Sequence, residues 1–244
     1  MKTDTTDQKP YDFSLTSLSR GLILLLMPLS AYIIGLFPIV FGFFYVYNKL
    51  ILLFQGVLFY FILSVVLVIS FFILILLESF IPLFFVRLFH IQVKSGTHKL
   101  SVKDKNFFLH MLFFTLYRPA LKLISVLPLV PLRAKIVKLA GLTIGKTSLL
   151  AGTEFIDEPY GVYIGEYTLI GGYSSIYAHI SDTNLRLKPV TIGNNCFIGN
   201  KSVILPGVKI EDNVFLEPGS VVREDQVLKK GKRYAGNPAH IINT

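Results

Sequence analysis

Two long apolar runs dominate the first third of the chain. Between residues 21 and 86 the only charged side chains are Lys49 and Glu78, and this length can cross a hydrocarbon core twice at about 20 residues per helix. The pattern predicts two transmembrane helices, at about residues 21–47 and 56–80, with a turn near Lys49. A cleaved signal peptide is the alternative for the first run, but the run exceeds the usual apolar core of about 7 to 15 residues and lacks a small-residue cleavage site.

Residues 87–140 mix apolar side chains with positive charge. The apolar stretches after residue 107 are too short to span a bilayer, because charged residues and prolines interrupt them. This composition favours helices along the inner membrane interface, with phenylalanine and leucine side chains in the leaflet and basic side chains reaching the head groups. The interrupting residues are Arg118, Pro119, Lys122, Pro128 and Pro131.

From Ile144 onward an aliphatic residue returns every six positions, a period that neither a helix nor a single strand produces. A short strand plus a tight turn, repeated three times per triangular coil, does produce it, so we expect an all-β solenoid of parallel strands. The aliphatic positions form three runs: Ile144, Leu150 and Ile156; Ile164, Ile170 and Ile176; and Ile192, Ile198, Ile204, Ile210, Leu216 and Val222.

The fifth position of each six-residue unit is small or slim, as a tight corner requires. Cys196 occupies one of these positions, so we interpret it as a buried corner residue in preference to a catalytic thiol. The full set is Thr168, Ser174, Cys196, Ser202, Val208, Val214 and Ser220.

The six-residue register breaks between Ile176 and Ile192, which are sixteen positions apart. His179 lies at the start of this insertion. An imidazole has an ordinary pKa of about 6.5, so it can accept and donate a proton near neutral pH. For an isolated histidine, however, a loop residue without catalytic role is the simpler interpretation.

Composition and charge extend this picture. The 244-residue chain is 52% hydrophobic with a mean hydropathy of +0.60, which is too apolar for a wholly soluble protein. The net charge of +9 comes from residues 87–140, where ten Lys or Arg stand against Asp104. Because Phe, Leu and Val separate these charges, they suit an anionic membrane surface and not a nucleic acid. With Cys196 as the single cysteine, no internal disulfide can form.

The same charges predict an orientation for the helical hairpin. Lys49 is the only charge near the turn, whereas five basic residues directly follow the second helix. The positive-inside bias therefore places the N-terminus and the C-terminal domain in the cytoplasm, in a cell-membrane protein with two spans.

The closing series "KPVTIGNNCFIGNKSVILPGVKIEDNVFLEPGSVVREDQVLKKGKRYAGNPAHI" resembles the hexapeptide-repeat acyltransferases, and among them the sugar and xenobiotic acetyltransferase branch. The resemblance rests on "PVxIG", "PGVxI", "GSVV" and "GNPA"; the repeats cover about residues 142–224, and residues 1–100 have no part in it. It implies a homotrimer of left-handed parallel β-helices with acyl-CoA bound between neighbours. It further implies that His179 is the catalytic base, acetyl-CoA or another acyl-CoA the co-substrate, and that no metal is needed.

The resemblance also implies binding residues. The four basic residues between 229 and 233 suit the phosphates of coenzyme A, and a solvated C-terminal turn is the alternative. An asparagine found upstream in the sugar enzymes has no counterpart in "SLLAGTEF", which points to a different acceptor. The coenzyme A set is Asn200, Pro218, Gly219, Ser220, Arg223, Lys229, Lys230, Lys232, Arg233, Asn237 and Pro238. The acceptor set is Asp157, Glu158 and Asp182, three carboxylates that could also hold His179 and that the sequence does not rank.

We therefore expect a cytosolic tail (1–20), a two-helix membrane anchor (21–86), a basic interfacial helical segment (87–140) and a left-handed β-helix acyltransferase domain (141–244). The expected reaction moves an acyl group, most simply acetyl, to a hydroxyl of a membrane-held glycan, lipid-linked sugar or lipid head group. Two alternatives stay open. One is a metal-dependent β-helix similar to carbonic anhydrase, although zinc catalysis uses about three protein ligands and the coils offer only His179 before His240. The other is a non-catalytic scaffold.

Overall fold

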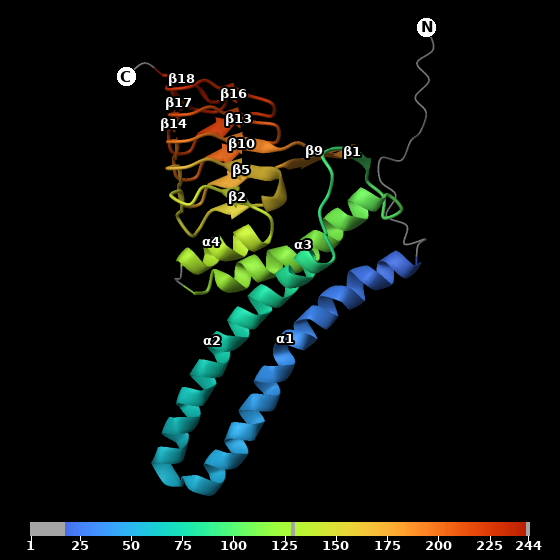
Figure 1. The fold of residues 1–244 in the computed structure, drawn as a ribbon, viewed down its shortest axis with the longest axis vertical. Helices are drawn as coiled ribbons and strands as arrows, with labels where there is room; N and C mark the ends of the chain where they lie inside the picture. Colours follow the sequence, from blue (N-terminus) through green and yellow to red (C-terminus); the bar gives the residue numbers. More distant parts are fainter. Residues whose placement is uncertain (1–17, 128–129, 243–244) are drawn as a thin grey trace.

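The structure, a computed structural model, describes residues 18–127 and 130–242, so most of the expected cytosolic tail lies outside the described residues. Helices α1 (Leu18–Leu53) and α2 (Gly56–Leu88) form a long antiparallel hairpin that projects away from the rest of the molecule (Figure 1). The chain reverses between these helices at residues 54–55, so the expected turn near Lys49 is wrong, and both helices are longer than expected.

The outer surface of this hairpin is apolar. Phe37 is 67% exposed, Leu52 80% and Val57 87%. In water such a surface would cost about 25 cal/mol per Å², so the hairpin is suited to an apolar environment.

Helices α3 (Lys105–Ile124) and α4 (Val130–Leu139) lie between the hairpin and the strands (Figure 1). The expectation that their large apolar side chains enter the leaflet is wrong for Phe107, Phe113 and Leu116, which are at most 6% exposed. Phe113 and Leu116 pack in the core shared with the end of α2 and the first coil. An apolar face can be buried by protein as well as by lipid, and the sequence pattern does not distinguish the two.

Three helices within the described residues are long and apolar enough to cross a membrane, whereas the sequence pattern predicted two. The third is α3. It differs from the others because 56% of its most apolar stretch is buried inside the protein, against 17% for α1 and 6% for α2.

The segment between α2 and α3 contains a strand, so the helical reading of residues 87–140 is incomplete. Strand β1 (Gly96–Lys99) pairs antiparallel with β9 (Asn184–Leu187), which pairs antiparallel with β8 (His179–Ser181). Val93, Phe107 and Leu187 belong to a small core beneath this sheet. The insertion in the six-residue register is thus a hairpin held by the segment between α2 and α3.

The remaining strands form a β-helix with three faces, parallel except for β18, which pairs antiparallel at the closing end. The first face contains β2 (Thr143–Ile144), β5 (Val162–Ile164), β10 (Val190–Ile192), β13 (Lys209–Ile210) and β16 (Val227–Leu228). The second contains β3 (Leu149–Leu150), β6 (Leu169–Ile170), β11 (Phe197–Ile198), β14 (Phe215–Leu216), β17 (Arg233–Ala235) and β18 (His240–Ile241). The third contains β4 (Phe155–Ile156), β7 (Ser175–Ile176), β12 (Val203–Ile204) and β15 (Val221–Val222).

The strand register confirms the six-residue pattern. Ile144, Ile164, Ile192, Ile210 and Leu228 align along the first face, and the other two faces stack their aliphatic residues in the same way. The seven corner residues expected to be small or slim are all buried, including the free thiol of Cys196. The coils fit the left-handed parallel β-helix expected from the resemblance.

Candidate active site

His179 lies where the chain leaves the third face and enters the inserted hairpin. Its side chain is 15% exposed, and its Nδ1 lies 2.5 Å from Oε1 of Glu158 and 3.8 Å from Oδ2 of Asp157. Both carboxylates are buried and lie between β4 and a short 3-10 helix, Pro159–Gly161. The backbone N–H of Ala178 donates to the second oxygen of Glu158 at 3.1 Å. The inserted hairpin therefore supplies the histidine, and the irregular turn before the 3-10 helix supplies Glu158 as its partner.

The histidine and its carboxylates are electrostatically coupled. Burial alone would lower the pKa of His179, but the contact with Glu158 and the charge of Asp157 outweigh burial and raise the pKa of His179 above its ordinary value. Burial raises the pKa of Glu158, and the contact with His179 opposes that effect. A proton between the two groups is therefore held more tightly than on an isolated imidazole.

One face of α3 completes the surroundings of His179. His110, Phe114 and Arg118 are spaced four residues apart and so share a helix face. The ring centroids of His110 and Phe114 lie 4.8 and 5.7 Å from that of His179. Arg118 donates two hydrogen bonds to Asp157, from Nε at 3.1 Å and from Nη2 at 2.8 Å, and its guanidinium lies 3.7 Å from the Phe114 ring centroid.

Sequence reasoning missed this helix face. From the sequence, His110 falls in the segment predicted to lie along the membrane interface (87–140), and it fits a catalytic role less well than His179. The spacing of His110, Phe114 and Arg118 is visible in the sequence. No local signal, however, indicates that α3 packs on the coil that carries Asp157 and Glu158.

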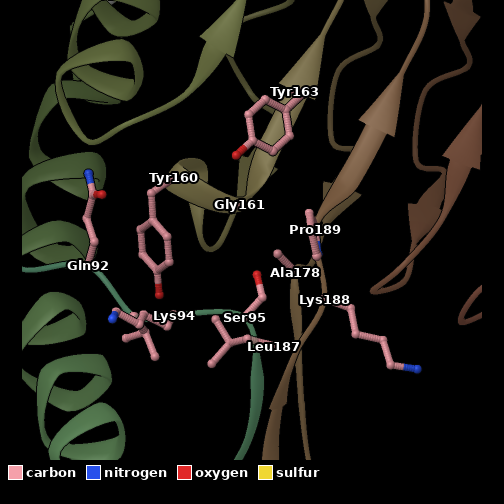
Figure 2. Close-up of a pocket in the computed structure, with 11 residues that line it drawn as sticks. Gln92, Lys94, Ser95, Tyr160, Gly161, Tyr163, Ala178, Leu187, Lys188 and Pro189 are labelled. Carbon is pink, nitrogen blue, oxygen red and sulfur yellow. The ribbon is translucent and has the colours of Figure 1, made fainter.

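Two cavities adjoin the residues just before His179. The first, of about 300 Å³, is lined by Ala178 together with residues of the segment after α2 and of the first coils. Figure 2 shows Lys94 and Ser95 of the segment after α2 on one side of this cavity and Lys188 and Pro189 on the other.

The second cavity, of about 500 Å³, lies between α3, α4 and the first coils. Asp157 and Tyr177 line it from the coils, and Arg118 and Lys122 line it from α3. It therefore combines an aromatic surface with positive charge and borders the carboxylates that contact His179.

The three predicted acceptor residues occupy different places. Asp157 and Glu158 lie beside His179, as described above. Asp182 lies at the turn of the β8–β9 hairpin, where it pairs with Arg186 at 2.8 Å, and no contact with His179 is present among the described residues. Of the three carboxylates, Glu158 is thus the one in position to orient the imidazole.

The predicted coenzyme A residues are spread over the corners of the coil. Asn200 and Pro218–Ser220 lie between the second and third faces, Arg223 lies between the third and first, and Lys229–Lys232 lie between the first and second. Asn237 and Pro238 follow β17 at the closing end. Within one chain these residues do not form a single surface.

Part of the positive charge in the closing segment is already paired. Lys229 lies 3.3 Å from Glu211, the backbone N–H of Lys230 donates to the same carboxylate at 2.9 Å, and Arg233 forms an ion pair with Glu217. The guanidinium of Arg233 also lies 4.5 Å from the Phe215 ring centroid. A phosphate would have to compete with these carboxylates.

His179 and two of the residues around it are also of the types that bind metal ions. One ligand atom each from His110, Glu158 and His179 lies within 4.8 Å of the others. The described residues therefore bring together three potential ligands, whereas the coil sequence alone offers His179.

Comparisons with known proteins agree with the fold. Residues 189–224 match the family described as bacterial transferase hexapeptide (six repeats). The chain is 37% identical over 87 residues to YvoF of Bacillus subtilis (strain 168), a protein that is named as an acetyltransferase by assignment only. The match covers 35% of this chain and 49% of YvoF. It is 37% identical over 95 residues to the galactoside O-acetyltransferase of Escherichia coli (strain K12), covering 36% of this chain and 46% of that protein.

Among solved structures, a maltose O-acetyltransferase from Clostridium difficile 630 superposes with a TM-score of 0.41 and 22% identity, covering 51% of this chain and 84% of that one. The chain spans about half the length of the curated relatives it matches. The matched residues 189–224 coincide with stacked coils of the β-helix, so this part of the chain is similar to the bacterial hexapeptide-repeat transferases.

Proposed function

We propose that this protein is a membrane-anchored, acyl-CoA-dependent O-acyltransferase, with acetyl-CoA as the favoured donor and His179 as the general base. The observation that carries the proposal is the buried contact between His179 and Glu158 at an irregularity of a hexapeptide-repeat β-helix. The names of the relatives, which are acetyltransferases, support the same reaction.

The proposed reaction uses the two sides of the imidazole differently. Glu158 faces Nδ1, so Nε2 takes the proton of the acceptor hydroxyl as its oxygen attacks the thioester carbonyl. Glu158 then stabilises the imidazolium that forms. When the C–S bond breaks, the imidazolium returns the proton to the thiolate of coenzyme A, and the acyl ester leaves on the acceptor.

The hairpin supports a membrane-held acceptor. In this proposal α1 and α2 cross the membrane, whereas α3, more than half buried in protein, lies at the cytosolic surface beneath the β-helix. The cavity beside α3 then opens near the head groups, and Arg118 and Lys122 give it positive charge. A lipid-linked sugar or a polar head group fits this position, with Asp157 at the inner wall.

A homotrimer would complete the donor site. The predicted coenzyme A residues lie on three corners of one solenoid, so a second chain must bring another set of corners into the same groove. A heterologous contact that closes on itself gives a ring, and three chains of parallel β-helix would enclose three equivalent grooves.

Incubation of native membranes with labelled acetyl-CoA tests the proposal. We expect label to enter the membrane fraction only when the full-length protein is present, and hydroxylamine to release it because the product is an ester. A protein that neither binds acetyl-CoA in calorimetry nor releases its thiol would be a scaffold. Stoichiometric zinc in the active protein would favour the metal-dependent alternative.

A second prediction concerns the pH dependence of the reaction. His179 must be neutral to accept a proton, so kcat/KM should rise with pH through the raised pKa of His179. In Glu158→Gln the carboxylate is lost while burial remains, so the pKa of His179 should fall and the acid limb should move to lower pH. The plateau should also fall, because the imidazolium loses its counter-charge.

The pH–rate profile of thiol release from acetyl-CoA measures this shift. Glu166→Gln is the matched control, since Glu166 is a half-buried carboxylate on another corner, where it accepts a hydrogen bond from the backbone N–H of Thr147. An acid limb that stays in place in Glu158→Gln, or that moves equally in both variants, would remove Glu158 from the mechanism.

A further inference from the structure

We propose that His110, carried by α3, is a second imidazole of the catalytic centre. It would donate a hydrogen bond to the carbonyl oxygen of the acyl donor as that oxygen becomes negatively charged. The inference rests on the proposed function, since it requires His179 to act on a thioester.

The first observation is that Nδ1 of His110 has no hydrogen-bond partner among the described residues. The residue is 3% exposed. A buried polar group without a partner costs about 1–3 kcal/mol. The fold keeps this histidine in an aromatic stack, 4.1 Å from the Phe114 ring centroid, where phenylalanine or leucine would pack without that penalty.

The distance to His179 is the second observation. The two rings meet edge to face with centroids 4.8 Å apart, and a nitrogen of each belongs to the cluster whose atoms lie within 4.8 Å of one another. Two nitrogens at this spacing can contact two different oxygens of one tetrahedral carbon. His179 would contact the attacking oxygen, and His110 would contact the former carbonyl oxygen at about 2.7–3.1 Å.

The neutral charge state of His110 suits a hydrogen-bond donor. Burial, with smaller contributions from the positive charges of His179, Arg118 and His98, lowers the pKa of His110 to about 3. His110 therefore keeps one N–H and stays neutral when His179 becomes an imidazolium. No proton moves onto or off His110: the hydroxyl proton passes to His179 and then to the thiolate, while the C–O bond forms and the C–S bond breaks.

The position of His110 is fixed by contacts on either side of it along α3. Asp104 caps the helix and accepts hydrogen bonds from the N–H groups of Asn106 and Phe107 at 2.8 and 3.1 Å. The buried Tyr117 hydroxyl donates to the carbonyl of Ile156 at 2.7 Å, one residue before Asp157. A donor on a helix held in this way is preorganised, as stabilisation of a developing oxyanion requires.

Three variants of the full-length protein test the proposal, with thiol release from acetyl-CoA as the assay and calorimetric acetyl-CoA binding as the check on folding. His110→Phe keeps an aromatic ring and removes both nitrogens, so kcat should fall roughly 10²- to 10³-fold with KM within about threefold. His110→Asn places an amide N–H near the position of Nδ1, and His110→Gln near Nε2. One of the two should recover at least about tenfold over His110→Phe and so identify the donating nitrogen.

Other results would overturn the proposal. Activity of His110→Phe within about threefold of wild type would exclude a catalytic hydrogen bond, and equal losses in all three variants would indicate a packing role. Zinc that is stoichiometric in wild type and lost in His110→Phe would make the cluster a metal site. Absence of thiol release from the wild-type protein would contradict the proposed function itself, which is a different outcome from an active enzyme indifferent to His110.

Discussion

His179→Ala should lower the turnover of acyl transfer by roughly 10²- to 10⁴-fold, the usual contribution of a positioned general base. The affinity for acyl-CoA should stay close to that of wild type, because the predicted coenzyme A residues lie on corners of the coil that His179 does not support. Folding should survive, since Glu158 keeps the N–H of Ala178 as a partner and its burial favours the neutral acid. Single-turnover rates and calorimetric binding measure the two quantities separately.

His90→Asn is the matched control for this experiment. His90 is exposed, follows α2 with a positive φ of 49° that asparagine tolerates, and has no place in the proposed site. Its rate should equal that of wild type. If His179→Ala kept activity within a few-fold of wild type, the base would have to be another group.

The β-helix was predictable because its physical requirement repeats along the sequence. Each aliphatic residue must stack on the residue of the next coil, so a register such as Ile164, Ile192 and Ile210 appears directly as a spacing. The same regularity made the insertion at residues 177–191 visible and drew attention to His179. Irregular elements have no such signal, and strand β1 was missed because its pairing partner β9 lies more than 80 residues away.

The candidate site was only half predictable for the same reason. His179, Asp157 and Glu158 were identified because they lie within or beside the repeats. His110 and Arg118 were not, because their role depends on how α3 packs on the first coil. The apolar residues of α3 fit burial in lipid and burial in protein equally well, and only the fold distinguishes these environments.

This packing changes what is expected of a shortened protein. The sequence pattern favours a β-helix that folds alone when the chain begins near Ala134. Such a chain would lack Arg118, which pairs with Asp157, and Arg133, which pairs with Glu154. Both carboxylates are at most 1% exposed, so removal of their partners leaves two buried charges at the base of the coil.

Arg133→Ala should destabilise the folded protein by about 3–5 kcal/mol, the usual cost of leaving a buried charge without its partner. Arg133 is 5% exposed and Glu154 1%; Nε of Arg133 lies 3.2 Å from Oε1 of Glu154. The same guanidinium donates to the carbonyl of Leu121 at 3.3 Å and to the hydroxyl of Ser125 at 2.5 Å. It therefore joins α4, the end of α3 and the first coil.

A double-mutant cycle separates the buried pair from general packing. In Arg133→Met with Glu154→Leu the charges are replaced by apolar groups, which is often neutral or stabilising, so the double variant should regain most of the stability that either single variant loses. Denaturant midpoints of the full-length protein in detergent measure the cycle. If Arg133→Met and Glu154→Leu each cost less than about 1 kcal/mol and simply add, the pair does not hold α3 and α4 to the β-helix. If the double variant regains the stability of wild type, the first coil depends on the helices because Arg133 on α4 neutralises the buried charge of Glu154.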